Sequence, residues 1–229
     1  MKITLCLVVF NELQGCKIDY KNLPKKSFCE IIAVDGGSTD GTVEYLKKMK
    51  IKVYRQKIPG LNAAYVAAND NAKGDYVISF FPKGNLRVND LKKFKDFFLS
   101  GHDLVIASRQ IKGSVNEEDG NFFKFRKWFV LLLAHFVGII WKKKETILIK
   151  DVLHGFKGWK KSAFKKMKIT KNGFSIDLQM VIRCYKLKLK QVEFPTHEKI
   201  RTYGKTHFKF LPTGIELIKY LYFELLRKN

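Results

Sequence analysis

An apolar run that leads directly into a loop of glycines and small polar residues constrains this chain more than any other feature. Residues 30–34 read Glu-Ile-Ile-Ala-Val, residues 35–42 read Asp-Gly-Gly-Ser-Thr-Asp-Gly-Thr, and residues 43–49 have helical spacing. This order predicts a buried parallel strand, a tight turn and a helix. Because open α/β sheets bind ligands at the carboxyl ends of their strands, the loop predicts a ligand site in an α/β fold. The alternative is a structural turn in which one of the polar residues 38–40 caps the helix.

The N-terminal segment has the same organisation. Residues 2–10 form a nearly continuous β-branched and apolar run, and Asn11 and Glu12 follow it directly. Glycines in the second loop let the backbone approach a ligand closely, and Asp35 can accept hydrogen bonds from a base or a ribose. We therefore predict that both strand ends hold one nucleotide. The residues of this predicted nucleotide site are Asn11, Glu12, Asp35, Gly36, Gly37, Ser38, Asp40 and Gly41.

The two strand-and-loop segments together resemble family 2 glycosyltransferases of the GT-A fold. Those enzymes begin with a strand that ends in Asn-Glu and continue with an Asp-Asp-Gly-Ser-x-Asp-Gly-Thr-like loop. Gly36 replaces the second aspartate of that loop here, and Val8 replaces the proline that usually precedes Asn-Glu. The resemblance implies a mixed, mostly parallel α/β sheet flanked by helices, with appended amphipathic helices. It also implies that the bound nucleotide is a nucleotide-diphosphate sugar.

One motif of that family is missing from this chain. In the family, the strand expected at residues 75–81 ends in an Asp-x-Asp motif that holds a divalent ion against the donor diphosphate. Phe81, Pro82 and Lys83 stand there instead, so we assign no metal-binding residue, although Mg²⁺ or Mn²⁺ remains possible as a cofactor. A departing diphosphate needs its negative charge neutralised, and Lys83 can bring a cation directly to the phosphates. The alternatives are a binding protein that has lost catalysis, or a Lys83 side chain that faces solvent.

Motifs in the second half resemble the polyprenyl-phosphate glycosyltransferases, such as the dolichol-phosphate mannosyltransferases. Residues 108–113 resemble Ser-Arg-Tyr-x-x-Gly, residues 151–157 resemble Asp-x-x-x-Gly-Phe-Arg/Lys, and residues 201–207 resemble Arg-x-x-Gly-x-Ser-Lys. The resemblance implies that Asp151 orients or deprotonates the acceptor, which makes Asp151 and Lys83 the predicted catalytic residues. The predicted phosphate-binding and acceptor-binding residues are Arg109, Arg126, Arg201, Lys205, Thr206 and His207.

Structural alternatives exist for these motifs as well. Asp151 can instead cap a helix or turn, and a basic loop such as residues 201–207 is often only solvated. Gln179 stands where the family commonly has glutamate, and whether Asp177 compensates is left open.

The charge of the chain calls for an acidic partner. Its 44 basic residues outnumber 21 acidic residues, which gives a formal net charge of +23. Nucleic acid, anionic lipid and the phosphates of a nucleotide sugar all fit such a charge. The chain has no zinc-finger, RNA-recognition or helix-turn-helix signature, so we predict no nucleic-acid partner. Its four cysteines form no Cys-x-x-Cys pair, which argues against zinc and favours a reduced, cytoplasmic setting.

Two apolar segments suggest contact with a membrane surface. Residues 128–141 are uncharged but fall short of the roughly 20 residues that a spanning helix needs. A tryptophan marks each end of this segment and basic residues flank it, which suits a helix at the lipid headgroups. A buried core helix is the alternative. Residues 213–228 predict an amphipathic helix that begins at a capping box of Thr213 and Glu216.

We therefore predict a single GT-A domain over residues 1–229. Residues 1–113 would bind the nucleotide sugar, residues 114–150 would form membrane-interface helices, and residues 151–229 would hold the acceptor and end in an amphipathic helix. The predicted reaction transfers a sugar to a dolichyl, undecaprenyl or other polyprenyl phosphate, or to a related cell-envelope acceptor, at the cytoplasmic face of the membrane. The alternatives are a glycosyltransferase that acts on a surface saccharide and an inactive nucleotide-sugar-binding homologue.

Overall fold

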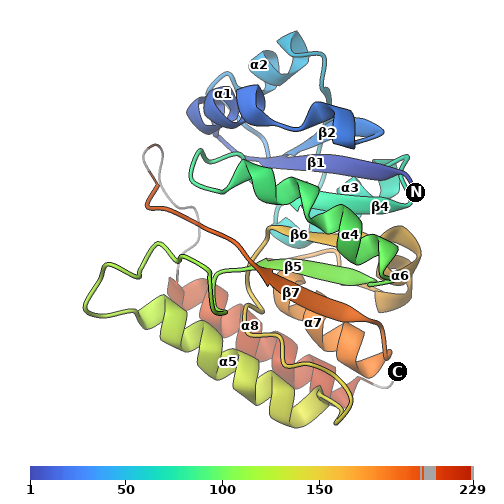
Figure 1. Ribbon diagram of the computed structural model, residues 1–229, viewed down its shortest axis with the longest axis vertical. Coiled ribbons are helices and arrows are strands. Elements are labelled where there is room, and N and C mark those ends of the chain that lie inside the picture. The colour runs from blue at the N-terminus through green and yellow to red at the C-terminus, as the bar shows by residue number, and fades with distance from the viewer. Residues whose placement is uncertain (202, 204–209, 228–229) are drawn as a thin grey trace.

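The computed structural model describes residues 1–201, 203 and 210–227, and this part of the chain folds around one seven-stranded sheet (Figure 1). The strands are β1 (Ile3–Val9), β2 (Glu30–Asp35), β3 (Lys52–Arg55), β4 (Tyr76–Phe80), β5 (Leu104–Ser108), β6 (Lys157–Lys160) and β7 (Gln191–Pro195). The α-helices are α1 (Leu13–Asn22), α2 (Thr42–Lys48), α3 (Leu61–Asn71), α4 (Phe94–Leu99), α5 (Phe125–Trp141), α6 (Lys161–Met167), α7 (Ile176–Lys186) and α8 (Phe210–Leu226), with short 3₁₀ turns at Lys25–Ser27 and Val88–Lys92.

The sheet is mixed and mostly parallel, as predicted. Its strand order is β3-β2-β1-β4-β6-β5-β7, and β6 runs antiparallel to both of its neighbours. All seven residues of β1 are buried, because helices cover both faces of the sheet. Side chains of β1 alternate between two core clusters. Cys6 and Val8 join the cluster on one face, and Leu5 and Leu7 join the cluster on the other.

This topology gathers several loops at one edge of the sheet. Strands β1, β2, β4, β5 and β7 run in the same direction, so the loops after their carboxyl ends meet there. The antiparallel β6 brings its first residue, Lys157, to the same edge, where it pairs with Ser79 near the end of β4. Residues that are far apart in the sequence therefore become neighbours at this edge.

The segment 114–150 contains one helix, α5, where we predicted more than one membrane-interface helix. After α5 the backbone turns extended at Lys142. The backbone after α5 is not helical, and Tyr185 of α7 bonds two of its polar groups. The Tyr185 hydroxyl donates to Ile147 O and accepts from Ile149 N, both at 2.9 Å. Hydrogen bonds supplied by α7 thus replace those of a second helix.

The C-terminal helix differs from its prediction at its start. Helix α8 begins at Phe210, which places Thr213 inside the helix, and the Glu216 carboxylate accepts the backbone N–H of Phe174. The predicted capping box is therefore wrong, because the helix starts before Thr213 and a tertiary contact occupies Glu216.

The face of α8 that packs on the protein is mixed, with Leu217, Tyr220 and Leu221 buried beside Glu224, and most other apolar side chains of α8 face outward. Glu224 is fully buried and pairs with Arg183 at 2.8 Å and Lys186 at 3.2 Å. Helices α5 and α8 contribute buried side chains to one hydrophobic core cluster, and α5 runs alongside α8 (Figure 1). The exposed apolar residues of these helices and of the turn before α5, here called the α5–α8 apolar surface, are Phe122, Phe123, Phe125, Trp128, Leu132, Phe136, Ile139, Ile140, Leu211, Ile215, Ile218, Tyr222, Phe223, Leu225 and Leu226. No described helix is both long and apolar enough to cross a bilayer.

Candidate active site

The loops after β1 and β2 are joined by hydrogen bonds at the common edge of the sheet. Asn11 donates its backbone N–H to Ser38 Oγ at 2.9 Å, and its Oδ1 accepts the N–H of Thr39 at 2.8 Å. Glu12 donates its backbone N–H to Thr42 Oγ1 at 3.0 Å. Asn11 has a φ of 54°, a left-handed conformation that asparagine tolerates better than most residues. The structure thus brings the predicted nucleotide-site residues of both loops together.

The carboxylates of the second loop shape that loop. Asp35 is buried, and its side chain accepts the N–H groups of Gly37 at 3.0 Å and Ser38 at 3.1 Å. Asp40 accepts the N–H of Thr42 at the start of α2 and the N–H of Leu13 at the start of α1, both at 3.0 Å. Asp40 thus fixes the first residues of both helices, although the N-cap residue of α2 is Gly41. Any contact of Asp35 with a base or ribose would add to its bonds within the loop.

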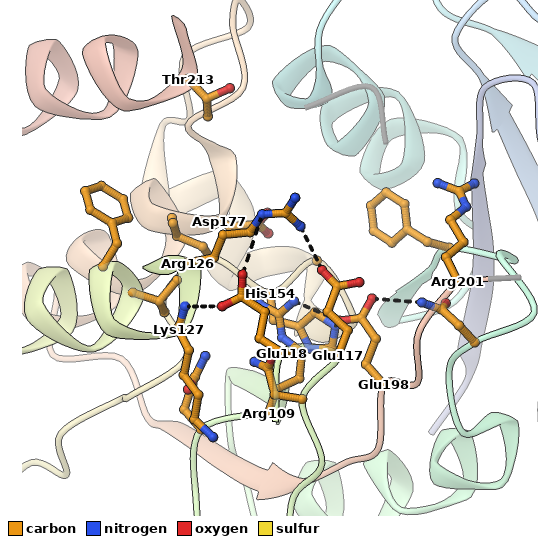
Figure 2. Close-up of a pocket in the computed structure, with 18 of the residues that line it drawn as sticks. Arg109, Glu117, Glu118, Arg126, Lys127, His154, Asp177, Glu198, Arg201 and Thr213 are labelled. Carbon is orange, nitrogen blue, oxygen red and sulfur yellow. Dashed lines mark hydrogen bonds and ion pairs between the residues drawn. The ribbon is translucent and has the colours of Figure 1, made fainter. Parts of the chain in front are cut away.

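A cavity of about 540 Å³ lies beside these loops. Figure 2 shows charged side chains from several elements converging on it. The charged and titratable residues that line the cavity are Lys83, Arg109, Glu117, Glu118, Arg126, Lys127, His154, Asp177, Glu198 and Arg201. Phe129 and Val130 of α5, and Thr213 and Leu217 of α8, also line it. The predicted nucleotide-site residues of the two loops do not line this cavity.

Arg109, directly after β5, lies between two carboxylates. Its Nε and Nη2 donate to the two oxygens of Asp151 at 2.9 and 3.0 Å, and its Nη1 donates to Glu198 Oε2 at 2.8 Å. Burial alone would raise the pKa of Asp151, but the Arg109 guanidinium lowers that pKa to about 2. Asp151 is fully buried and does not line the cavity. This placement suits a residue that positions Arg109 better than one that touches an acceptor.

Glu198 and His154 are cavity residues that the sequence did not single out. His154 Nε2 lies 3.7 Å from Glu198 Oε2. Burial, reinforced by the nearby Arg109, lowers the pKa of His154 to about 4, so its imidazole is neutral at physiological pH. His154 belongs to the matched motif at residues 151–157, which was a usable signal. Glu198 has no such signal, because only the sheet brings the segment after β7 beside Arg109.

Lys83, the predicted replacement for a metal ligand, follows β4 and lines the cavity. Its ammonium lies 5.3 Å from the centre of the Phe81 ring. Within residues 1–201, 203 and 210–227, no carboxylate lies within 4.0 Å of Lys83, although Arg109 and Arg126 each have such a partner. Lys83 therefore brings to the cavity a positive charge that is not held in a close ion pair, although it acts on the nearby Glu198 and helps to lower the pKa of that carboxyl.

The other predicted phosphate-binding residues differ in how tightly they are held. Arg126 pairs with Glu117 at 2.9 Å, and its side chain is 58% exposed, compared with 16% for Arg109. Arg201 pairs with Glu12 and so connects the cavity to the loop after β1. The predicted residues Lys205, Thr206 and His207 lie outside the described residues.

Comparison with known proteins identifies the family. The sequence model described as "Glycosyl transferase family 2" matches residues 5–168. The chain belongs to glycosyl transferase family 2.

Two curated relatives agree with this family assignment. The chain is 26% identical over 183 residues to "Glycosyltransferase AglJ" of Haloferax volcanii, covering 78% of this chain and 55% of that protein. It is 26% identical over 234 residues to "Dolichol-phosphate mannosyltransferase" of Pyrococcus furiosus, covering 96% of this chain and 64% of that protein. The chain thus spans less than two thirds of the length of these two relatives.

A solved structure has the same fold. Glucosyl-3-phosphoglycerate synthase from Mycobacterium tuberculosis, solved with Mn²⁺, uridine diphosphate and glucosyl-3-phosphoglycerate, superposes with a TM-score of 0.69 at 15% identity. The match covers 100% of this chain and 81% of that chain. The likeness confirms the predicted GT-A fold.

The family 2 metal motif has no equivalent among the described residues. In residues 1–201, 203 and 210–227, no three His, Cys, Asp or Glu side chains are grouped so that they could hold a metal ion. Divalent ions such as Mg²⁺ prefer oxygen ligands, whereas Phe81, Pro82 and Lys83 follow β4. These residues do not fit a divalent ion at this position.

Asp177, and not Gln179, is the residue of α7 that lines the cavity, although Gln179 stands at the position where family 2 commonly has glutamate. Gln179 is fully buried and donates to Thr170 Oγ1 at 2.5 Å, so it takes a structural position. Asp177 lines the cavity, and its carboxylate pairs with the buried Lys157 at 2.9 Å and accepts from Tyr65 Oη at 3.3 Å. Asp177 is therefore held in place as the cavity carboxylate of α7.

Proposed function

We propose that this family 2 member transfers a sugar from a nucleotide-diphosphate sugar to a polyprenyl phosphate at the cytoplasmic face of a membrane. The observation that carries the proposal is the position of the cavity between two unlike walls. Strand-end loops form one wall and contribute Lys83, and α5 and α8 form the other. The outer sides of those two helices carry the α5–α8 apolar surface. A water-soluble donor and a lipid-borne acceptor could therefore approach the same cavity from different sides.

The donor would be held by the loops after β1 and β2, within the predicted nucleotide-sugar part at residues 1–113. The diphosphate would then extend towards Lys83, whose charge has no close carboxylate partner among the described residues. A fixed cation in a partly enclosed site stabilises a leaving diphosphate more than the same charge in water, because the low local dielectric strengthens the attraction.

The acceptor phosphate would bind at Arg126 in preference to Arg109. An exposed ion pair such as Arg126–Glu117 contributes only about 0–1 kcal/mol, so a phosphate can replace Glu117. Arg109 is held by three hydrogen bonds to two buried carboxylates, which a phosphate would have to break. A phosphate acceptor is already ionised and needs positioning more than a base. In this arrangement Asp151 positions Arg109, and Asp177 is the carboxylate that faces the acceptor.

The α5–α8 apolar surface would rest on anionic lipid, consistent with the net charge of +23 and with the lysines at 142–144 directly after α5. We expect the double substitution Leu132→Glu and Ile139→Glu to lower the affinity for anionic vesicles about 100-fold or more, because two large side chains contribute roughly 1.5–3 kcal/mol each when buried. Sedimentation with vesicles measures this affinity.

Leu99→Glu is the matched control for the vesicle experiment. Leu99 is 65% exposed, as Leu132 is at 71%, but it lies on α4 and outside the α5–α8 apolar surface. Its substitution should leave vesicle binding unchanged. Equal binding by the double variant and the wild type would contradict the proposed membrane orientation.

A transfer assay tests the reaction itself. The protein is incubated with radiolabelled nucleotide sugars and vesicles that contain a polyprenyl phosphate, and the product is partitioned between organic solvent and water. Label that moves into the organic phase supports the proposal. Label that stays in water on an added saccharide would favour a surface-saccharide glycosyltransferase. Nucleotide binding without transfer or hydrolysis would identify an inactive homologue.

A further inference from the structure

One corner of the cavity is built from three residues to which the sequence assigned no role. Asn85 follows β4, Gln110 follows β5 and Glu198 follows β7, and all three line the cavity. Glu198 pairs with Leu86 in an isolated β-bridge, and Lys199 donates its N–H to Asn85 O at 3.0 Å. The backbone therefore holds this corner in a defined geometry.

The corner contains buried polar atoms that have no partner among the described residues. These atoms are Asn85 Oδ1 and both side-chain amide atoms, Oε1 and Nε2, of Gln110. The orientation of Asn85 is well defined, because its Nδ2 donates to two acceptors, Glu198 Oε1 at 3.3 Å and Lys199 O at 3.1 Å. Buried polar groups without hydrogen bonds are costly and rare, so three such atoms beside a cavity indicate a ligand that would satisfy them.

The balance of donors and acceptors identifies the kind of ligand. Glu198 is an acceptor only. Burial would raise its pKa, but positive charges nearby, that of Arg109 above all and that of Lys83 as well, lower that pKa to about 2. Asn85 Oδ1 and Gln110 Oε1 are also acceptors, and Gln110 Nε2 is the one unused donor among these atoms. A phosphate brings only acceptors, so it could satisfy Gln110 Nε2 alone. A sugar hydroxyl both donates and accepts, so several hydroxyls can satisfy all of these atoms.

The local charge gives this corner no excess attraction for a phosphate. Arg109 pairs with the carboxylates of Asp151 and Glu198, and the charge of Lys83 also acts on Glu198, so the two positive and two negative charges balance. A neutral, hydroxyl-rich group needs no excess positive charge, whereas a phosphate would gain little from this corner.

We propose that Asn85, Gln110 and Glu198 bind the hydroxyl groups of the transferred sugar and determine which sugar is accepted. The proposal rests on the proposed glycosyl transfer and adds the site of the sugar ring. Arg109 then acts by orienting Glu198, with Asp151 behind it. Lys83, which lines the same cavity, remains available to the diphosphate at the border of this corner.

Calorimetry with two nucleotides and their sugars tests this assignment. Dissociation constants are measured for UDP and UDP-glucose and for GDP and GDP-mannose, and the ratio within each pair reports the contribution of the sugar. We expect the wild type to bind one nucleotide sugar more tightly than its nucleotide. Glu198→Gln should reduce that preference about tenfold or more, because a charged acceptor of the sugar hydroxyls has been removed.

Gln110→Leu provides a second, independent variant. It should also reduce the preference for the nucleotide sugar, yet raise the Tm of the free protein, because it removes two buried polar atoms that have no partner. A purely structural glutamine would not combine these two effects. Lys95→Gln, at an exposed side chain on α4 that does not line the cavity, is the control and should leave both quantities unchanged.

Three results would overturn the assignment. Glu198→Gln could keep the sugar preference and bind UDP, GDP and inorganic phosphate more tightly, which would make the corner a phosphate site. Gln110→Leu could melt at a lower temperature with an unchanged sugar preference, which would make the amide structural. Failure of the wild type to bind any of the four nucleotide probes would refute the proposed function, and this assignment with it.

Discussion

Replacing Lys83 with methionine is expected to lower kcat for sugar transfer by a factor of about 10² to 10³, the usual effect of removing one preorganised group that stabilises developing charge. Lys83 occupies the position of a family 2 metal ligand, lines the cavity and has no close carboxylate partner among the described residues. Methionine retains the apolar length of the side chain and removes only its charge. Because Lys83 has no close ion pair to lose, the Tm should change little. Initial rates at saturating donor, together with a thermal melt, measure both quantities.

The matched control is Lys95→Met, at an exposed lysine on α4 that does not line the cavity. It removes the same charge and should leave kcat unchanged. A Lys83→Met enzyme that retained its rate would refute the role of Lys83. Tight donor binding by the wild type only in the presence of Mg²⁺ or Mn²⁺ would also contradict the idea that a lysine replaces the ion.

Replacing Asp151 with alanine is expected to destabilise the fold by about 3–5 kcal/mol, because it removes one partner of a buried ion pair and leaves the other charge poorly compensated. Asp151 is fully buried and bonded to Arg109 through both of its oxygens, and Glu198 alone would remain beside the guanidinium. Urea unfolding at neutral pH measures the loss. Asp70→Ala, at an exposed aspartate on α3, is the control and should change stability by less than about 0.5 kcal/mol.

The same ion pair makes stability depend on pH in the acid range. The pKa values of Asp151 and Glu198 are both lowered to about 2 in the folded protein. Unfolded carboxyl groups titrate near about 4, so the unfolded state binds more protons between these values. The stabilisation is therefore fully present above about pH 5 and is lost as pH falls through about 4 to 2. The Asp151→Ala protein should lose less stability than the wild type over this range, and equal losses would contradict the pairing.

The fold could be read from local patterns because parallel strands covered on both faces are apolar along their whole length. Residues 2–10 and 30–34 have this pattern, and β1 and β2 occupy these segments. The positions of Lys83, Arg109 and Asp177 near strand or helix ends were also accessible, because loops at the carboxyl ends of parallel strands share one edge of a sheet.

Predictions failed where distant partners replaced local ones. Glu216 was expected to cap its own helix, but it accepts the N–H of Phe174, and α8 begins three residues before Thr213. The acceptor role of Asp151 stays a prediction, and the structure shows Asp151 bonded to Arg109 and not among the residues that line the cavity. Local sequence does not reveal such contacts, because each joins residues that are 42 positions apart in the chain.

The sequence by itself determined the sheet, the family and the absence of the Asp-x-Asp carboxylates after β4, because each depends on residue types in short, ordered segments. Only the tertiary structure decided which charged side chains form close ion pairs and which do not. It paired Arg109 with Asp151 and Glu198, placed Lys83 at the cavity without a close ion pair, and buried Glu224 of α8 against Arg183. The physical reason is that the strength of a charge depends on its neighbours and its burial, and folding alone brings those neighbours together.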